Sequence, residues 1–160
     1  MAEGKSGPAR AVEHGHFTIE RVFDAPVPLV FRAWADKAAK ARWFAGPDGW
    51  KEEIREQDFR VGGHDRLKGV HPNGMTSDFR AEYRDIVPDE RIIYVYDMHV
   101  NGRKISVSLA TVTFRPAPGG TRMTVTEQGC YLDGYDDAGS RERGTNLLMD
   151  RLGASLRAGS

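Results

Sequence analysis

Two acidic side chains fall where the alternation along a strand turns them toward a protein interior. Near the C-terminal end of the chain, Met123, Val125 and Glu127 share one face of an expected strand, and the two apolar residues mark that face as buried. The same alternation places Asp65 beside Leu67. Either carboxyl group could act as a general base, because burial raises its pKa. Pairing with an arginine or accepting a hydrogen bond from a ligand hydroxyl is the alternative, and we favour it because burial alone assembles no mechanism.

Tyrosines are the other polar groups that strand alternation brings toward the same interior. Tyr83 falls on one face with Phe79, and we expect both to point inward. Tyr94 and Tyr96 lie on a stretch, 91–99, that is apolar on both faces. Their inward direction is therefore a hypothesis that alternation does not decide.

Histidine and cysteine offer weaker signals. His64 and His71 are seven residues apart on one expected strand, an odd separation that puts them on opposite faces and excludes a shared metal site. The pair His14 and His16 could ligate a metal, but no partner cluster is evident, so we interpret it as part of a solvated tail. Cys130 has no basic neighbour in sequence that would activate its thiol. We predict neither a metal site nor a cofactor.

Composition bounds the class of protein. The 160 residues suit one domain, and 23 Lys and Arg balance 23 Asp and Glu. That neutrality argues against nucleic acid or a membrane surface as partner, since both are held by clustered basic residues. A single cysteine is typical of a reducing compartment, and no stretch has the length of apolar residues that a membrane-spanning helix needs. We therefore expect a cytoplasmic protein.

The N-terminal third begins with a leader and continues into a strand and two helices. Residues 1–15 lack periodicity, so we expect a disordered leader followed by a single domain over 16–158. Alternation predicts a strand at 17–23. Two prolines and an apolar helical face that includes Trp34 then indicate a first helix, and a second short helix over 37–44 contains Trp43 and ends before Gly46-Pro47. Core packing accounts for Trp34 and Trp43, whereas Trp50, beyond Gly49, is the better candidate for a pocket rim.

The remainder reads as an antiparallel meander closed by a long helix. Turn residues such as Asn101-Gly102 separate the expected strands at intervals of about 8–12 residues. The strand at 104–115 changes character along its length, so its inward face is left open. Apolar residues at helical spacing, among them Thr145, Leu148 and Met149, then predict a helix over 138–156. The six expected strands of the meander are 51–59, 64–71, 76–87, 91–99, 104–115 and 121–130.

This order of elements, with its motifs, resembles a known superfamily. The chain is similar over about residues 17–156 to START-like, or Bet v 1-like, proteins, and among them to the family named for homology to the activator of Hsp90 ATPase. The motifs that carry the resemblance are Arg21 with Ala25-Pro26, Val30-Phe31 with Ala33-Trp34, Trp43-Phe44 before Gly46-Pro47, Asp58, Arg60, Gly62-Gly63, Asn73-Gly74, Tyr83, the IVPDERIIY run and Gly120-Thr121-Arg122.

The resemblance implies an α+β helix-grip fold of the order β-α-α-β6-α, in which a seven-stranded antiparallel sheet curls around the C-terminal helix and leaves a pocket between them. Three positions depart from the family's pattern: Thr145 follows Gly144 where a tryptophan is common, Asp65 replaces an aromatic residue, and Glu127 stands where a histidine is common. We therefore expect a roomier and more polar pocket than in relatives. The residues that we expect to line it are Trp34, Trp43, Trp50, Asp65, Leu67, Phe79, Tyr83, Tyr94, Tyr96, Glu127, Thr145, Leu148 and Met149.

Three functions follow as hypotheses. The leading one is a non-enzymatic carrier or sensor that binds a small hydrophobic or amphipathic molecule, because no recognisable catalytic constellation accompanies the pocket. The resemblance implies a second, an interaction protein that stimulates an Hsp90-type chaperone ATPase. The third is a cyclase or dehydratase with Glu127 or Asp65 as base and a tyrosine as proton donor. The sequence leaves the ligand's identity and the oligomeric state, including a homodimer, open.

Overall fold

The computed structural model describes residues 10–159, and its element order is the predicted one. The predicted α+β helix-grip fold is confirmed. The helices and strands, in chain order, are β1 (Val12–Phe23), α1 (Val27–Ala35), α2 (Lys37–Ala41), β2 (Lys51–Gln57), β3 (His64–Val70), β4 (Thr76–Val87), β5 (Arg91–Val100), β6 (Arg103–Ala117), β7 (Gly120–Leu132) and α3 (Ala138–Ala158).

All seven strands form one antiparallel sheet with the order β1-β7-β6-β5-β4-β3-β2. The first strand therefore pairs with the last, and the meander runs outward from it to β2. The β5–β6 hairpin turns at Asn101 and Gly102, whose φ angles of 53° and 77° are those of the predicted type I′ turn. Asn and Gly tolerate this left-handed region, which explains why they occupy the turn.

The N-terminal strand is longer than predicted. Because β1 begins at Val12 and pairs with β7 as far as Leu132, residues 12–15 belong to the sheet and not to a disordered leader. His14 and His16 are consequently strand residues, not parts of a solvated tail. Of the rest of the predicted leader, residues 10 and 11 precede the strand, and residues 1–9 lie outside the described residues. The extension could not be predicted from the local sequence, because apolar and polar residues alternate poorly over 12–15. These residues are held in the sheet by their pairing with β7.

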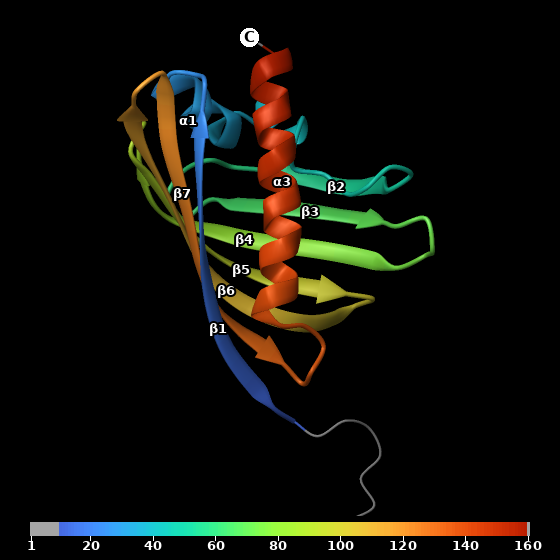
Figure 1. Cartoon of the computed structure of the whole chain (residues 1–160). Coiled ribbons are helices and arrows are strands. Elements are labelled where there is room, and N and C mark those ends of the chain that lie inside the picture. The colour runs from blue at the N-terminus through green and yellow to red at the C-terminus, as the bar shows by residue number, and fades with distance from the viewer. Residues whose placement is uncertain (1–9, 160) are drawn as a thin grey trace, which may run out of the picture.

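Helix α3 lies across the concave face of the curled sheet, which we call the inner face (Figure 1). The Asp137 carboxylate caps its N-terminus by accepting from the Ser140 backbone N–H at 2.8 Å. The side of α3 that faces the sheet includes the buried residues Met149 and Leu152. Toward the C-terminal end, Gly153 allows close approach, since a Cβ there would lie 3.2 Å from the Phe23 ring. The helix is thus held tightly near its C-terminal half. No helix among residues 10–159 is both long and apolar enough to cross a membrane.

The inner face of β6, which the sequence leaves open, carries Ser106, Ser108, Ala110, Val112 and Phe114, all of them buried. The change in residue size along this strand has a structural reason. Phe114 packs edge-on against Phe31 of α1, with ring centroids 5.3 Å apart, whereas the small residues lie toward the other end of the strand.

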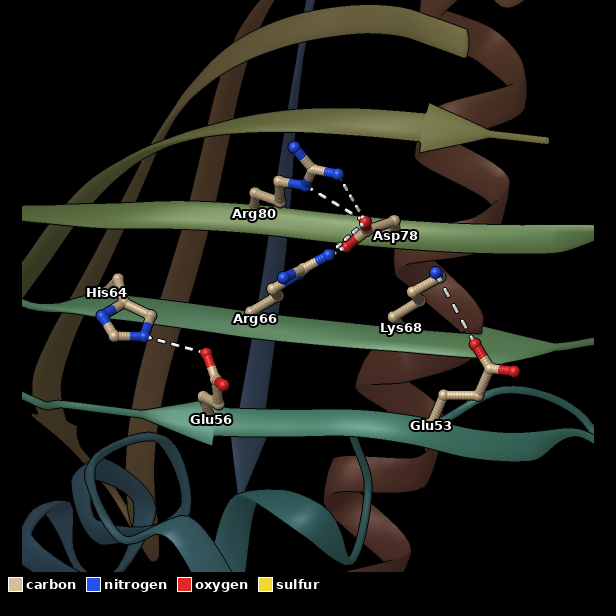
Figure 2. Close-up of polar contacts among 7 residues, drawn as sticks. All are labelled: Glu53, Glu56, His64, Arg66, Lys68, Asp78 and Arg80. Atoms are coloured by element: carbon tan, nitrogen blue, oxygen red, sulfur yellow. Dashed lines mark hydrogen bonds and ion pairs between the residues drawn. The ribbon is translucent and has the colours of Figure 1, made fainter. Parts of the chain in front are cut away.

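The outer face of the sheet, turned away from α3, is built from charged pairs (Figure 2). Arg66 and Arg80 both donate to the Asp78 carboxylate, with Arg66 Nη2 and Arg80 Nη2 at 2.9 and 2.8 Å from Asp78 Oδ2. The Arg66 contact links β3 to β4, whereas Arg80 lies on β4 together with Asp78. Glu53 and Lys68 form a looser pair, at 3.7 Å, between β2 and β3.

Candidate functional site

A cavity of about 270 Å³ lies between the inner face of the sheet, the segment around α2 and helix α3. Aromatic rings dominate its wall, and α3 contributes the small residues Gly144 and Thr145. The lining residues are Trp34, Lys40, Trp43, Phe44, Phe79, Tyr94, Tyr96, Met98, Val125, Glu127, Asp136, Ser140, Arg141, Gly144, Thr145, Leu148 and Met149.

The structure brings most of the predicted pocket residues to this wall and places four elsewhere. Asp65 and Tyr83 lie behind the wall, where both side chains are buried. Leu67 is a core residue paired with Phe79 across β3 and β4 but is not in the wall. The predicted residues that line the cavity are Trp34, Trp43, Phe79, Tyr94, Tyr96, Glu127, Thr145, Leu148 and Met149.

The interpretation of Trp50 as a pocket rim is wrong. Its ring covers two glycines: a Cβ added to Gly69 would lie 2.0 Å from the ring, and one added to Gly46 would lie 2.3 Å from it. Trp50 therefore packs the loop before β2 against β3, outside the cavity wall. The local sequence places Trp50 near Gly49 but does not show that distant glycines leave it a slot.

A buried lysine, which the sequence analysis did not single out, reaches the cavity from α2. Lys40 is 4% exposed, and its ammonium contacts the Asp65 carboxylate. The ammonium lies 4.7 Å from the centroid of the Phe44 ring and 6.0 Å from that of Tyr94, within the range of cation–π attraction. The sequence did contain a signal for its position. Lys40 precedes Trp43 by three residues and Phe44 by four, a spacing that places all three on one helical face.

The carboxylate of this pair has a second donor. The Tyr83 hydroxyl donates to Asp65 Oδ2 at 2.9 Å, and the Gln57 side-chain amide donates to the Tyr83 oxygen at 3.2 Å. Burial, followed by the neighbouring Asp65 charge, raises the pKa of Tyr83 well above its ordinary value. Tyr83 therefore stays neutral and acts as a donor. The Lys40–Asp65 pair is thus supported by hydrogen bonds from β2 and β4, as a buried ion pair requires.

A second polar cluster crosses the cavity wall between β5, β7 and α3. The Tyr96 hydroxyl donates to Glu127 Oε1 at 2.7 Å and accepts from Arg141 Nη1 at 2.8 Å. Arg141 also donates to Ser106 Oγ and to Asp136 Oδ2, each at 2.8 Å. Burial raises the pKa of Glu127, and the Tyr96 hydrogen bond and the Arg141 charge oppose that rise.

Both inward carboxyl groups therefore have partners within the protein. Asp65 is paired with Lys40, and Glu127 is bonded to Tyr96 in front of Arg141. Neither uses Arg21, which donates at 2.9 Å to Asp150 on α3. That the pocket is roomier and more polar than in relatives stays a prediction, and the inward direction of Asp65 and Glu127 is consistent with it.

The histidines and the cysteine lie apart from the cavity. His14 Nδ1 is 3.6 Å from Cys130 Sγ across β1 and β7, a basic neighbour that only the long first strand provides. His64 contacts Glu56 on the outer face, and His71 contacts Ser77. Among residues 10–159, no three side chains of metal-ligating type gather into a site.

The comparisons with known proteins agree with this fold. The family model of the activator of Hsp90 ATPase homolog 1-like proteins matches residues 24–157. A putative uncharacterized protein from Rhizobium leguminosarum is 43% identical, with a TM-score of 0.89 over 94% of this chain and 99% of the other. The Mll3558 protein from Rhizobium loti is 41% identical, with a TM-score of 0.81 over 91% and 99%.

A more distant structure shows how far the fold extends. The AHSA1-like protein from Aeromonas hydrophila is 21% identical, with a TM-score of 0.70 over 90% of this chain and 93% of the other, and so shares the fold. No curated protein matches the chain in sequence.

Proposed function

Since the chain belongs to the activator of Hsp90 ATPase homolog 1-like family, whose helix-grip fold here encloses an aromatic cavity, we propose that it binds a small hydrophobic or amphipathic molecule as a carrier or sensor. The observation that carries the proposal is the cavity of about 270 Å³ itself. Ligand pockets are typically concave and apolar with a few fixed polar groups, and this wall has that composition.

The aromatic rings in the cavity wall favour a compact ligand with a flat apolar body. Phe79 and Tyr96 are adjacent, with ring centroids 4.9 Å apart, and Phe44 meets Phe79 edge-on at the same separation. Rings arranged in this way offer faces and edges to another ring. Because a volume of about 270 Å³ lies near the lower end of ligand pockets, the ligand is a small molecule and not a long acyl chain.

The internal pairing of the carboxyl groups supports binding over catalysis. A general base needs a free lone pair within reach of the substrate's proton. Asp65 accepts from Lys40 and Tyr83, and Glu127 accepts from Tyr96. These contacts give both groups a role in positioning the wall, and Glu127, which is bonded through Oε1 alone, is the one that keeps lone pairs for a base.

Filling the cavity tests this proposal. Thr145→Trp restores the aromatic residue common in the family and should occupy the cavity, so it should abolish binding of small aromatic compounds in a thermal-shift screen. Leu147→Trp, at a position 64% exposed on the same helix, is the matched control and should bind as the wild type does. The proposal fails if the wild type shows neither co-purified ligand by native mass spectrometry nor a thermal shift, or if Thr145→Trp binds normally.

A catalytic role of Glu127 is the second candidate, which its raised pKa and its contact with Tyr96 favour. A cyclase or dehydratase reaction would take Glu127 as base and Tyr96 as proton donor. Glu127→Gln should then abolish turnover of a bound substrate and leave its affinity unchanged. Equal turnover in the variant and the wild type would rule this assignment out.

Activation of a chaperone ATPase is suggested by the description of the family alone. The relevant measurement is the turnover of an Hsp90-type ATPase with and without this protein. Stimulation that survives Thr145→Trp would place the activity outside the cavity. No change in turnover would exclude this candidate.

A further inference from the structure

Two side chains that line the cavity have hydrogen-bond donors for which residues 10–159 provide no acceptor. Lys40 Nζ carries three N–H donors, and among residues 10–159 the acceptor it contacts is Asp65. The ring faces of Phe44 and Tyr94 attract its charge but accept no directed hydrogen bond comparable to one from oxygen. Lys40 therefore keeps donor capacity on the side of the cavity.

The second donor is the hydroxyl of Tyr94. The side chain is in the cavity wall and only 8% exposed, yet its hydroxyl has no hydrogen-bond partner among residues 10–159. The hydroxyl is also not sealed among side chains, in contrast to the unpartnered polar atoms of Trp34 and Tyr131. A buried tyrosine hydroxyl normally finds a partner. That of Tyr94 faces open volume, where a ligand can supply one.

We propose that the cavity recognises a neutral carbonyl oxygen on its ligand, with the Lys40 ammonium and the Tyr94 hydroxyl as the donors. The inference rests on the proposed function and narrows it to ketones, aldehydes, quinones or amides attached to a flat apolar body. A carbonyl oxygen has two lone pairs and so accepts from both donors. It brings no hydrogen of its own that would need an acceptor in the wall.

The charges around the cavity explain why a neutral carbonyl group is preferred over a ligand carboxylate. The Lys40 charge is already balanced by Asp65, and that of Arg141 faces Asp136. A ligand carboxylate would add an anion to an apolar site with no unpaired cation to receive it, and burial of an uncompensated charge is costly. Glu127 in the same wall would add repulsion whenever it is ionised. A carbonyl dipole meets the same donors without that cost.

Three probes of similar shape test the class of ligand on the full chain: acetylnaphthalene, isopropylnaphthalene and naphthoate. Protein NMR titrations that follow the indole N–H signals of Trp34 and Trp43, both in the cavity wall, give the affinities and locate the probe. The ketone should bind at least threefold to tenfold more tightly than the hydrocarbon, roughly the ratio that the neutral hydrogen bond from the Tyr94 hydroxyl provides by itself. Naphthoate should bind more weakly than the ketone.

Two variants then assign the donors. Tyr94→Phe removes one hydroxyl that has no internal partner, so it should fold normally, reduce the preference for the ketone and leave hydrocarbon affinity unchanged. Tyr135→Phe, on the surface beside Arg103, is the matched control and should change neither affinity. Lys40→Met combined with Asp65→Asn removes the second donor without leaving a buried charge, and should remove the remaining preference.

The outcomes separate the two proposals. Equal affinities for ketone and hydrocarbon, or a preference unchanged in Tyr94→Phe and in the double variant, would overturn the carbonyl inference and leave cavity binding intact. Tightest binding of naphthoate would overturn it in favour of an anionic ligand. If none of the probes shifts the two indole signals, the proposed function fails, and the inference fails with it.

Discussion

Asp78 on the outer face of the sheet and Glu127 on its inner face are both almost inaccessible to solvent, and their pKa values move in opposite directions. They are 5% and 4% exposed. Burial raises both pKa values, but at Asp78 the hydrogen bonds from Arg66 and Arg80 reverse the effect and lower the pKa to about 2. At Glu127 the opposing contacts are weaker, and the pKa stays above its ordinary value.

The kind of partner and the position in the fold together decide the difference, because Asp78 lies on the outer face and Glu127 lies in the wall of the cavity between sheet and helix. Asp78 receives two guanidinium groups directly (Figure 2), whereas Tyr96 stands between Glu127 and Arg141. The outer face therefore uses full charges to join strands. Around Glu127 the inner face places a neutral hydroxyl between two charges, whereas Asp65 meets the Lys40 ammonium directly.

The largest effect is expected where a charge of the inner face loses its partner. Lys40→Met leaves the buried Asp65 carboxyl group without its ion-pair partner, so it should lower the free energy of unfolding by about 3–5 kcal/mol. Urea denaturation measures the change. Lys40→Met with Asp65→Asn should recover most of the loss, and a single variant as stable as the wild type would contradict the assignment of a buried ion pair.

The next largest effect is expected on the outer face, where the stability that Asp78 contributes should depend on pH. Because the folded pKa of Asp78 is lowered from 3.8 to about 2, the stability it contributes is present above pH 3.8 and is lost as pH falls toward 2. The difference corresponds to about 2 kcal/mol. Asp78→Asn should be less stable than the wild type by that amount at pH 6, and the two should converge near pH 2 in thermal unfolding. A constant gap across this range would show that Asp78 does not titrate as described.

Glu127 should respond with the opposite sign. Its folded pKa is raised, so its contribution is fully present below the unfolded pKa and is lost as pH rises through the folded pKa. Glu127→Gln keeps an acceptor for Tyr96 and should match the wild type at pH 4 but be more stable than the wild type at pH 8. Chemical denaturation at both pH values measures this, and a variant less stable at pH 8 would refute it.

The smallest effect is expected for exposed pairs of the outer face. Glu56 and His64 are 3.0 Å apart, and their side chains are 53% and 60% exposed. Glu56→Gln should change the free energy of unfolding by less than about 0.5 kcal/mol, because water screens such a pair. A loss as large as that from Asp78→Asn would remove the distinction between the buried and the exposed parts of this face.

The sequence alone was sufficient for the order of elements and for the side chains that alternation turns inward. Asp65 and Glu127 could be placed because apolar neighbours two residues away mark the buried face of each strand. The helices could be placed because prolines, glycines and helical spacing bound them locally. The position of Trp50 could not be predicted, since the slot it fills is made by glycines that lie on both sides of it in sequence.

Only the tertiary structure decided the polar pairing inside the cavity and the start of the first strand. Lys40 and Arg141 are ordinary charged helix residues in sequence, and each becomes buried only because its helix packs on the sheet. Residues 12–15 join the sheet because β7, more than a hundred residues away, offers them an edge. The local sequence indicates the secondary structure that a residue prefers. Pairing between segments that are distant in sequence determines whether the residue adopts it.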